Sequence, residues 1–393
     1  MGGKKITMCF LSVAVISVAA LSIQNCSSSS SNEDPKNSGT QSSSSAGSSS
    51  SSDSSSSSSS EEQLSSSASS SSLSSAISSS SGASSSSSVA KSSSSQSPDD
   101  GKPIVYMTTQ ITPGGLIAVY EALGLEASGK VAVKISTGEP ANRKYFLNPN
   151  LIKNLVQRVS GTIVESNTAY GGSRASTAAH KQVARDHGFT DIATVVIMDE
   201  NGSDSIPVTG TDTKRLKGWD YVGKAFKNYD FHIVLSHFKG HQMGGFGGAL
   251  KNMSIGYASS MGKAWIHSAG TSRTSPFGGS NTQDAFLESM AEAAKAVADW
   301  NKGKILYINV MNNLSVDCDC MSTIAEPTMK DIGILASLDP VALDKACLDL
   351  VDNAPDGKDL VERIDSKNGR LTVTHAEKIG LGKREYKLEP VEP

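Results

Sequence analysis

Several signatures of common enzyme classes are missing from this chain. It contains no Gly-x-x-x-x-Gly-Lys-Ser/Thr loop and no Gly-x-Ser-x-Gly elbow, which argues against P-loop nucleotide hydrolysis and α/β-hydrolase chemistry. Its glycine-rich segment lacks the following acidic residue and helix of a dinucleotide-binding fingerprint. No pair of carboxylates forms a recognisable signature of glycoside cleavage.

Net charge, cysteine and long hydrophobic runs are also scarce. The formal net charge is −3 over 393 residues and no broad basic face is indicated, so we expect no nucleic-acid partner. The 5 cysteines do not form the repeated Cys-x-x-Cys pairs that a zinc ribbon needs. Beyond the first residues we find no second hydrophobic span and no internal repeat.

The beginning of the chain is typical of an export signal. A basic start at Lys4 and Lys5 precedes an apolar run that is too short to span a bilayer comfortably. Signal peptidase could cut after Ala20, or Cys26 could be the lipidated residue of a lipobox in which Asn25 is unusual. We expect residues 1–26 to be a lipoprotein-type signal peptide, because a long tether follows. The protein would then be exported and membrane-anchored through a lipid, or otherwise periplasmic or extracellular.

Residues 27–100 are mostly serine, with almost no aromatic or branched apolar side chains. Such a composition cannot bury enough surface to offset the entropy of ordering. This segment is therefore predicted to be a disordered Ser-rich linker that holds the folded part away from a membrane or wall.

Residues 101–393 alternate between strand-like and helix-like patterns. That alternation predicts an α/β fold with a mostly parallel sheet flanked by helices on both faces. The predicted strands are Ile104–Met107, Val131–Ile135, Thr162–Glu165, Ala193–Met198, Phe231–Ser236, Ala264–His267, Ile305–Val310 and Ile332–Ser337. The predicted helices are Leu116–Leu123, Pro149–Val159, Ser176–His187, Val222–Phe226, Asp284–Trp300, Asp339–Val351 and Leu371–Ile379.

Three chemistry-bearing segments follow predicted strands. They begin after Ser236, after His267 and shortly after Val310. Ligands of parallel sheets sit beyond the carboxyl ends of the strands, so we expect these segments to meet at one edge.

The first segment, residues 236–252, holds two histidines, two lysines and five glycines within seventeen residues. Backbone N–H groups of glycines, together with lysine ammonium groups, favour a phosphate or carboxylate. A tight irregular connection would explain the glycines equally well. The predicted anion-binding residues are Lys239, Lys251, Gly245, Gly247 and Gly248, with Arg174 from another loop as a possible carboxylate clamp or a surface residue.

A Cys-x-Cys motif at Cys318 and Cys320 is the other informative feature. Two such cysteines can hold one soft metal ion, with Asp317 and Asp319 as further ligands or as orienting groups. A disulfide within the pair, or from the pair to Cys347, is the alternative in an oxidising compartment. We otherwise expect Cys347 to be a buried apolar residue.

Imidazole groups could complete a metal site with the cysteine pair. The candidates are His237, His241 and His267, because they lie in or near the glycine-rich loops. The remaining histidines fall within predicted helices or strands and are interpreted as structural: His180, His187, His232 and His375.

Five motifs occur in a defined order between about residues 130 and 388. They are Ser236–His241, Gly245–Gly248 with Lys251 and Asn252, Gly262 and Lys263 with His267, Asp317–Cys320, and Asp331–Gly333 with Asp339–Val341. Together they resemble the DUF362 family, a family of unknown function in which many members are described as iron–sulfur centre proteins.

The chain departs from that family at one point. Members called iron–sulfur proteins often carry a ferredoxin-like cysteine insert after the His267 motif, but Ser268–Thr282 contains no cysteine. Three core cysteines cannot fill a Cys₄ site, which argues against ferredoxin-type clusters. A single metal ion would need mixed Cys, His and Asp ligands.

The sequence therefore predicts an exported DUF362-like protein with a metal site formed by Cys and His loops and a small anionic ligand on the Gly/Lys loop. Such a site could serve a redox or metal-assisted reaction. The alternative is a non-catalytic, surface-displayed binding module in which Cys318 and Cys320 are structural.

Overall fold

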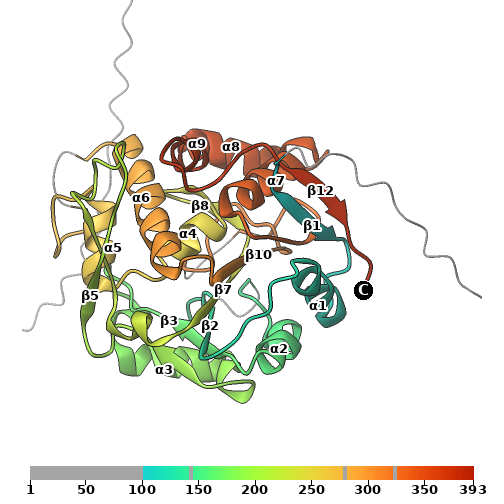
Figure 1. Ribbon diagram of the computed structural model, residues 1–393, viewed down its shortest axis with the longest axis horizontal. Coiled ribbons are helices and arrows are strands. Elements are labelled where there is room, and N and C mark those ends of the chain that lie inside the picture. The colour runs from blue at the N-terminus through green and yellow to red at the C-terminus, as the bar shows by residue number, and fades with distance from the viewer. Residues whose placement is uncertain (1–100, 141–144, 278–280, 322–324) are drawn as a thin grey trace, which may run out of the picture. The chain divides into compact units, whose positions relative to one another are not determined.

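The computed structural model describes residues 101–140, 145–277, 281–321 and 325–393, and its centre is an eight-stranded sheet (Figure 1). Its strand order is β12–β1–β11–β10–β7–β2–β3–β4. The strands of the sheet are β1 (Ile104–Thr108), β2 (Val131–Lys134), β3 (Thr162–Glu165), β4 (Val195–Ile197), β7 (Phe231–His237), β10 (Ile305–Met311), β11 (Gly333–Ser337) and β12 (Lys387–Pro390). Two hairpins lie outside it, formed by β5 (Ser203–Pro207) with β6 (Trp219–Gly223) and by β8 (Lys239–His241) with β9 (Gly245–Gly247).

The sheet is mostly parallel, as predicted. Only β11 runs against its two neighbours, β1 and β10. The other five neighbouring pairs are parallel.

The helices are α1 (Pro113–Ala122), α2 (Pro149–Arg158), α3 (Thr177–Asp186), α4 (Ala249–Ser254), α5 (Ser260–His267), α6 (Gln283–Asn301), α7 (Pro340–Asn353), α8 (Lys358–Ser366) and α9 (Arg370–Lys378), with 3₁₀ turns at Ser173–Ala175, Phe189–Asp191 and Lys224–Asn228.

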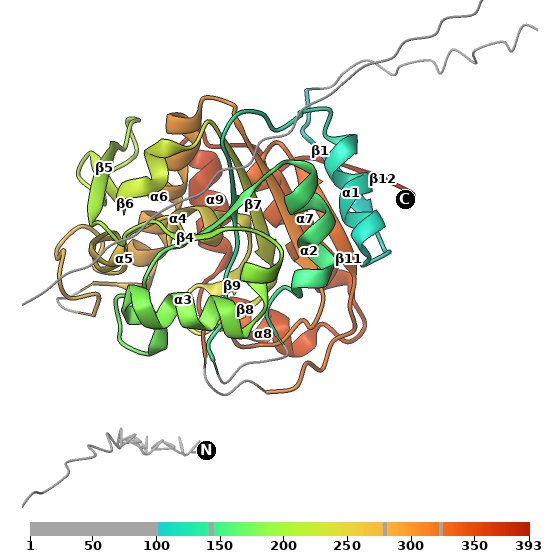
Figure 2. The same ribbon diagram turned by 90° about the horizontal axis from the view of Figure 1, so that it is seen from below.

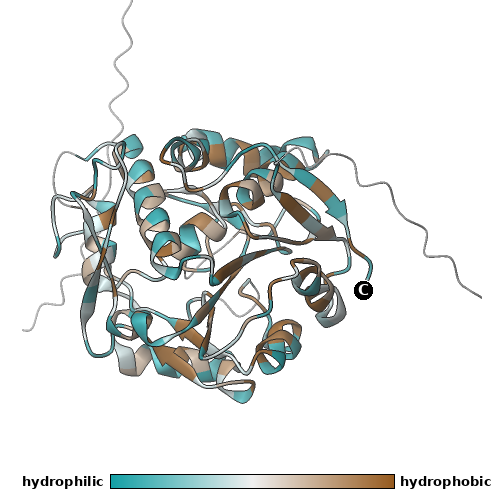
Figure 3. Ribbon diagram, in the orientation of Figure 1, coloured by the Kyte–Doolittle hydropathy of each residue, from teal (hydrophilic) through white to brown (hydrophobic). Residues whose placement is uncertain are grey.

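Helices cover both faces of the sheet, which confirms the predicted α/β class. Figure 1 places α1 and α2 on one side of β7 and β10, with α4, α6 and α9 on the other; Figure 2 views the molecule from the side of α2 and α3. A hydrophobic core lies on each face of the sheet, and alternate residues of β10 point into one or the other. Ile308 and Val310 pack with α1 and α2, whereas Tyr307 and Met311 pack with the helices on the opposite face. Every residue of β7 and β10 is buried, and both strands are apolar along most of their length (Figure 3).

Helix starts follow the predicted sequence signals. Asp339 caps α7 by accepting hydrogen bonds from the backbone N–H groups of Val341 and Ala342, and Pro340 occupies the first turn. Asn148 and Pro149 begin α2 in the same way. Each cap satisfies donors that would otherwise lack partners, a contribution of about 1 kcal/mol.

Two predicted elements were wrong or incomplete. Ala264–His267 is the end of helix α5 rather than a strand. Ser259 caps this helix by accepting a hydrogen bond from the Gly262 N–H. Gly262 lies so close to the Tyr221 carbonyl that a Cβ at this position would be 1.8 Å from its oxygen. A short, fully buried apolar run fits either element, so periodicity could not decide. The predicted helix Val222–Phe226 is the end of β6 followed by a 3₁₀ turn.

The strand order reverses at the boundary between β2 and β7. From there β3 and β4 extend one way and β10, β11 and β1 the other. The carboxyl ends of β2, β3 and β7 carry Lys134, Glu165 and His237, so charged and imidazole side chains gather where doubly wound sheets bind ligands.

The predicted signal peptide and Ser-rich linker, residues 1–100, lie outside the described residues. Within the described ranges, no helix combines the length and the apolar character that crossing a bilayer requires.

Candidate functional site

A cavity of about 430 Å³ opens at the carboxyl edge of the sheet. Its walls come from the loops after β2, β3, β7 and β10 and from α4 and α5. The three sequence segments expected to converge do line one cavity. The predicted site residues in its lining are Arg174, His237, Lys239, His241, Gly247, Gly248, Lys251, His267, Cys318 and Cys320.

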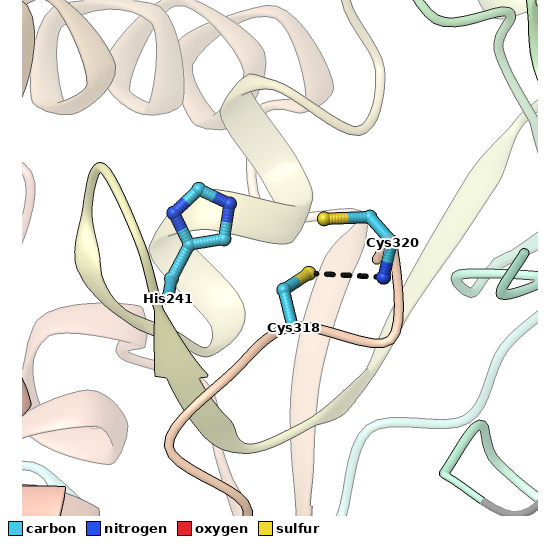
Figure 4. Close-up of side chains that lie close together, drawn as sticks. All are labelled: His241, Cys318 and Cys320. Atoms are coloured by element: carbon cyan, nitrogen blue, oxygen red, sulfur yellow. Dashed lines mark hydrogen bonds between the residues drawn. The ribbon is translucent and has the colours of Figure 1, made fainter. Parts of the chain in front are cut away.

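Cys318, Cys320 and His241 form a cluster at one end of this cavity (Figure 4). One ligand atom of each lies within 4.8 Å of those of the other two. The backbone N–H of Cys320 donates a hydrogen bond to the Cys318 sulfur at 3.3 Å. Both cysteines are free thiols, as is Cys347, so neither predicted disulfide is formed. Cys347 is fully buried in the core, as expected.

Close backbone contact brings the cysteine loop to His241. The N–H of Gly240 donates to the Ser315 carbonyl at 2.8 Å, and a Cβ at Gly240 would lie 2.2 Å from the carbonyl oxygen of Val316. Only glycine allows β8 and this loop to approach so closely. The sequence of β8 thereby sets the position of a loop more than seventy residues later.

The two aspartates of the Asp-Cys-Asp-Cys motif fix the same loop on opposite sides. Asp317 pairs with Arg363 of α8 at 2.6 Å, and the buried Asp319 pairs with Lys239 of β8 at 3.1 Å. Lys239 holds the pKa of Asp319 well below its usual range, against the effect of burial. These contacts assign the aspartates an orienting role.

The two thiols have different acidities. Burial raises the pKa of Cys318 well above its ordinary value. A hydrogen bond from the Cys318 side chain lowers the pKa of Cys320 to about 7, and the positive charges of Lys251 and Arg174 act in the same direction. One sulfur therefore ionises easily, while the other keeps its proton until a cation displaces it.

The ring of His241 is oriented by backbone groups. Its Nδ1 accepts hydrogen bonds from the N–H groups of Met243 and Gly244 at 3.2 and 2.9 Å. A neutral ring in this arrangement carries its proton on Nε2, and this second nitrogen faces the cysteines (Figure 4). Ligation of a metal ion through Nε2 requires the loss of that proton.

The other two predicted imidazole ligands lie apart from the cysteine cluster. His237 donates from Nε2 to the Asn312 carbonyl at 2.6 Å, and its Nδ1 is 3.9 Å from a carboxylate oxygen of Asp319. His267 donates from Nδ1 to the Lys263 carbonyl at 2.7 Å and stacks on Phe286. Both line the cavity, but of the three only His241 is brought to the cysteines.

Most glycines of the predicted anion loop have structural contacts. Gly245 has a positive φ of 79° and packs against Gly369. A Cβ at Gly248 would lie 2.4 Å from Asp344, whose carboxylate accepts the first N–H groups of α4, from Ala249 and Leu250. Those donors are occupied, and only Gly247, between the Lys239 and Lys251 stems, borders the cavity without such a contact. An anion-binding role for these glycines stays a prediction.

Five cationic side chains line the cavity against three carboxylates, Glu139, Glu165 and Asp319. Three of the cations have carboxylate partners. Lys134 pairs with Glu165 at 2.6 Å, Arg174 pairs with Glu139 at 2.7 Å and with Glu165 at 3.4 Å, and Lys239 pairs with Asp319. Two N–H groups of Arg174 are thus engaged by protein carboxylates rather than left to a ligand.

Lys251 and Lys263 are the other two cations. Neither forms an ion pair with any residue in the described ranges. A charge without a carboxylate partner is suited to an anion, and anion binding by Lys251 stays a prediction.

A comparison with protein-family models matches the domain of unknown function DUF362 over residues 131–349, more than half of the chain. The chain belongs to the DUF362 family. No curated protein matches it. Among solved structures, the lactate racemase apoprotein from Thermoanaerobacterium thermosaccharolyticum is 14% identical with a TM-score of 0.36, covering 66% of this chain and 59% of that one. A protein from Thermotoga maritima is 12% identical with a TM-score of 0.35, covering 68% and 58%. The chain thus spans less than two thirds of either neighbour, and such likenesses carry no information about activity.

Sequence reasoning missed four charged residues in the cavity of this DUF362 protein: Lys134, Glu139, Glu165 and Lys263. Two of them carried a signal. Lys134 and Glu165 end otherwise apolar strands, which is where a parallel sheet places its ligand. Lys263 stands in one of the family motifs, directly before the predicted strand Ala264–His267, so its position in the cavity depended on recognising helix α5.

Proposed function

We propose that the protein binds a single metal ion through Cys318 and Cys320, with His241 as third ligand, and holds a small anionic ligand in the adjoining cationic cavity. The convergence of two sulfur atoms and one imidazole nitrogen within 4.8 Å supports the metal site. A thiolate-bound ion beside an anion pocket is suited to a redox or metal-assisted reaction on a small acid.

The donor set favours a soft or borderline ion. Thiolates bind zinc and copper(I) well, and two sulfurs with one imidazole leave a coordination position open. His241 is the weaker member, because its Nδ1 must give up two backbone hydrogen bonds when the ring changes tautomer to ligate through Nε2. We therefore treat the two cysteines as the obligatory ligands.

Elemental analysis tests the metal site. Protein purified without chelators and under reducing, anaerobic conditions should contain about one ion per chain. Cys318→Ser or Cys320→Ser should abolish binding, whereas His241→Gln should weaken it about 10- to 100-fold.

Cys347→Ser is the matched control, because Cys347 is a free buried cysteine that does not line the cavity. Its metal content should equal that of the wild type. A wild-type protein with far less than one ion per chain, together with unchanged behaviour of the Cys318 and Cys320 variants, would show that the metal proposal is wrong.

A second candidate function is a metal-free binding module for a small anion. The surplus of two lysines without carboxylate partners among the described residues supports anion binding. This surplus does not require the metal ion, because two thiolates and a divalent ion together add no net charge. Anion binding that chelators do not affect, in a protein without a stoichiometric ion, would select this function over the first.

We further propose that the protein is exported and anchored through a lipid on Cys26, with residues 27–100 as a spacer. The basic and apolar start of the chain and the serine-rich composition support this proposal. The cavity would then meet ligands outside the cytoplasm.

A further inference from the structure

Lys263 lies buried at the cavity wall and has no ion-pair partner among the residues that the structure describes. Its side chain is 4% exposed, and its Nζ donates one short hydrogen bond, to the Ala258 carbonyl at 2.6 Å, and a long one to the Ser166 carbonyl at 3.5 Å. An ammonium group has three donors and one full charge, so carbonyl groups alone leave it incompletely balanced. A buried charge is normally paired or bound to a ligand.

Lys134 shows what a satisfied lysine looks like in the same cavity. Its Nζ donates to the Ile135 carbonyl, to the Glu165 carboxylate and to the Asn252 side chain. It is even less exposed than Lys263, at 1%. Within the described ranges, Lys134 therefore has a complete set of partners and Lys263 does not.

The same cavity also has an apolar surface, formed by aromatic rings. Tyr170 and Phe277 are 41% and 65% exposed, with ring centroids 5.7 Å apart, and both line the cavity. Tyr170 meets the ring of His267 edge-on at 5.2 Å. Exposed aromatic rings at the edge of a polar cavity offer stacking surface to an apolar part of a ligand.

We propose that the cavity binds a small organic oxyanion, its acid group on Lys251 and Lys263 and its aryl or alkyl group against Tyr170, His267 and Phe277. This inference extends the anion-binding part of the proposed function and does not depend on the metal ion. The cavity volume of about 430 Å³ suits a single ring with an acid substituent.

Calorimetric titration at pH 7 with four probes tests the ligand class. Phenylacetate and phenyl phosphate carry the apolar group, and acetate and inorganic phosphate lack it. We expect one phenyl probe to bind at least about tenfold more tightly than its counterpart. Preference for phenylacetate identifies a carboxylate ligand and preference for phenyl phosphate a phosphate ester. Equal binding within each pair, or no binding of either phenyl probe, overturns the proposal.

Variants separate the two halves of the site. Lys263→Met should weaken the preferred phenyl probe about tenfold or more through loss of a charge-assisted hydrogen bond. Phe277→Ala should weaken the same probe and leave acetate and phosphate unchanged. Unaltered affinity in Lys263→Met would overturn the role of this lysine.

Thermal melting without ligand distinguishes a binding lysine from a structural one. Lys263→Met should raise the melting temperature, because it removes a buried charge that has no ion-pair partner in the described ranges. The matched Lys134→Met should lower it, because Glu165 loses its 2.6 Å partner and keeps only the longer contact with Arg174 at 3.4 Å. A fall in both variants would mean that Lys263 is structural and would overturn the proposal. The opposite signs also show that weaker binding in Lys263→Met does not come from misfolding.

The double variant Cys318→Ser, Cys320→Ser separates this inference from the metal proposal. If the metal proposal alone is wrong, the wild type contains no ion and the double variant still binds the phenyl probe. If this inference alone is wrong, the wild type contains its ion, but Lys263→Met binds the probe as tightly as the wild type.

Discussion

At the scale of single residues, the cavity differs from an ordinary protein interior in how its charges are balanced. Burial lowers the pKa of Lys263 from 10.5 to about 8; Asp199 and Glu165 oppose this change, and Lys134 and Arg174 add to it. Compared with a lysine in water, a depression of that size destabilises the charged form relative to the neutral one by on the order of 3 kcal/mol in the empty protein. A bound anion would stabilise the charged lysine. The desolvation of this lysine has then already occurred on folding and does not count against the affinity for the anion.

The pH dependence of anion binding follows from this pKa. Only the protonated form of Lys263 attracts an anion, so the share of the affinity that depends on this lysine should fall as pH rises through about 8, by up to about tenfold per pH unit. Titrations of the preferred phenyl probe between pH 6 and 9.5 check this. Lys263→Met should lack the fall near pH 8, and an equal fall in both proteins would contradict the assignment.

Stability should change in the opposite sense over the same range. Between pH 8 and 10.5 the unfolded chain binds a proton at Lys263 that the folded protein has lost. The free energy of unfolding of the empty protein therefore gains a term from this group that rises with pH across that interval. A comparison of chemical denaturation of the wild type and Lys263→Met at pH 7 and 10 isolates it.

At the scale of elements, the hairpin of β8 and β9 holds the site together. It begins directly after the buried strand β7, carries Lys239 and His241, and contacts the cysteine loop through Gly240. The glycines that look like an anion nest in the sequence are needed mainly for close packing, at Gly245 against Gly369 and at Gly248 against Asp344. A hairpin of three-residue strands is marginal alone, so neighbouring loops and α8 must support it.

Gly240→Ala tests this dependence. The new Cβ would lie 2.2 Å from the backbone oxygen of Val316, so the cysteine loop must move away from β8. We expect destabilisation of about 1–3 kcal/mol and loss of metal binding, measured by chemical denaturation and elemental analysis.

Gly114→Ala in α1 is the control, since its nearest neighbours would be 3.7 Å from the new Cβ. That variant should be neutral or slightly stabilising, by up to about 1 kcal/mol, because alanine favours helix. Normal metal content in Gly240→Ala would contradict a role for the Gly240 contact in positioning the site.

At the scale of the whole molecule, the fold places the site at the strand-order reversal between β2 and β7. Segments spread over nearly half of the chain, from Lys134 to Met321, supply its walls. The predicted leader and the Ser-rich segment precede this folded part in sequence. If Cys26 is lipidated, a contour of about 3.3–3.6 Å per residue lets the spacer reach far from a membrane surface.

Cys26→Ala tests the lipid anchor. In a bacterial host, the wild type should fractionate with membranes and incorporate a labelled fatty acid, and Cys26→Ala should lose both properties. A mature wild-type chain that begins at Leu21 and carries no lipid would instead show cleavage after Ala20. Cys9→Ala, within the apolar run of the leader, is the control and should behave as the wild type.

Local patterns in the chain were enough to predict the α/β class, most strands and helices, and the motifs that identify the family. Hydrophobic periodicity and caps such as Asn148 and Asp339 act locally, so they can be interpreted from neighbouring residues. The positions of the predicted strands also indicated that the segments with His241, Cys318 and Cys320 would meet, because loops after parallel strands share one edge.

Which of these residues lie in contact depends on how the whole chain folds. His241 joins the cysteines, whereas His267 is carried away on α5, a helix whose buried apolar run is locally indistinguishable from a strand. Lys239 is neutralised by Asp319 and Lys263 is left without an ion-pair partner in the described part of the chain. Charge balance depends on partners brought together through space from distant strands and loops, and no local pattern in the chain encodes that pairing.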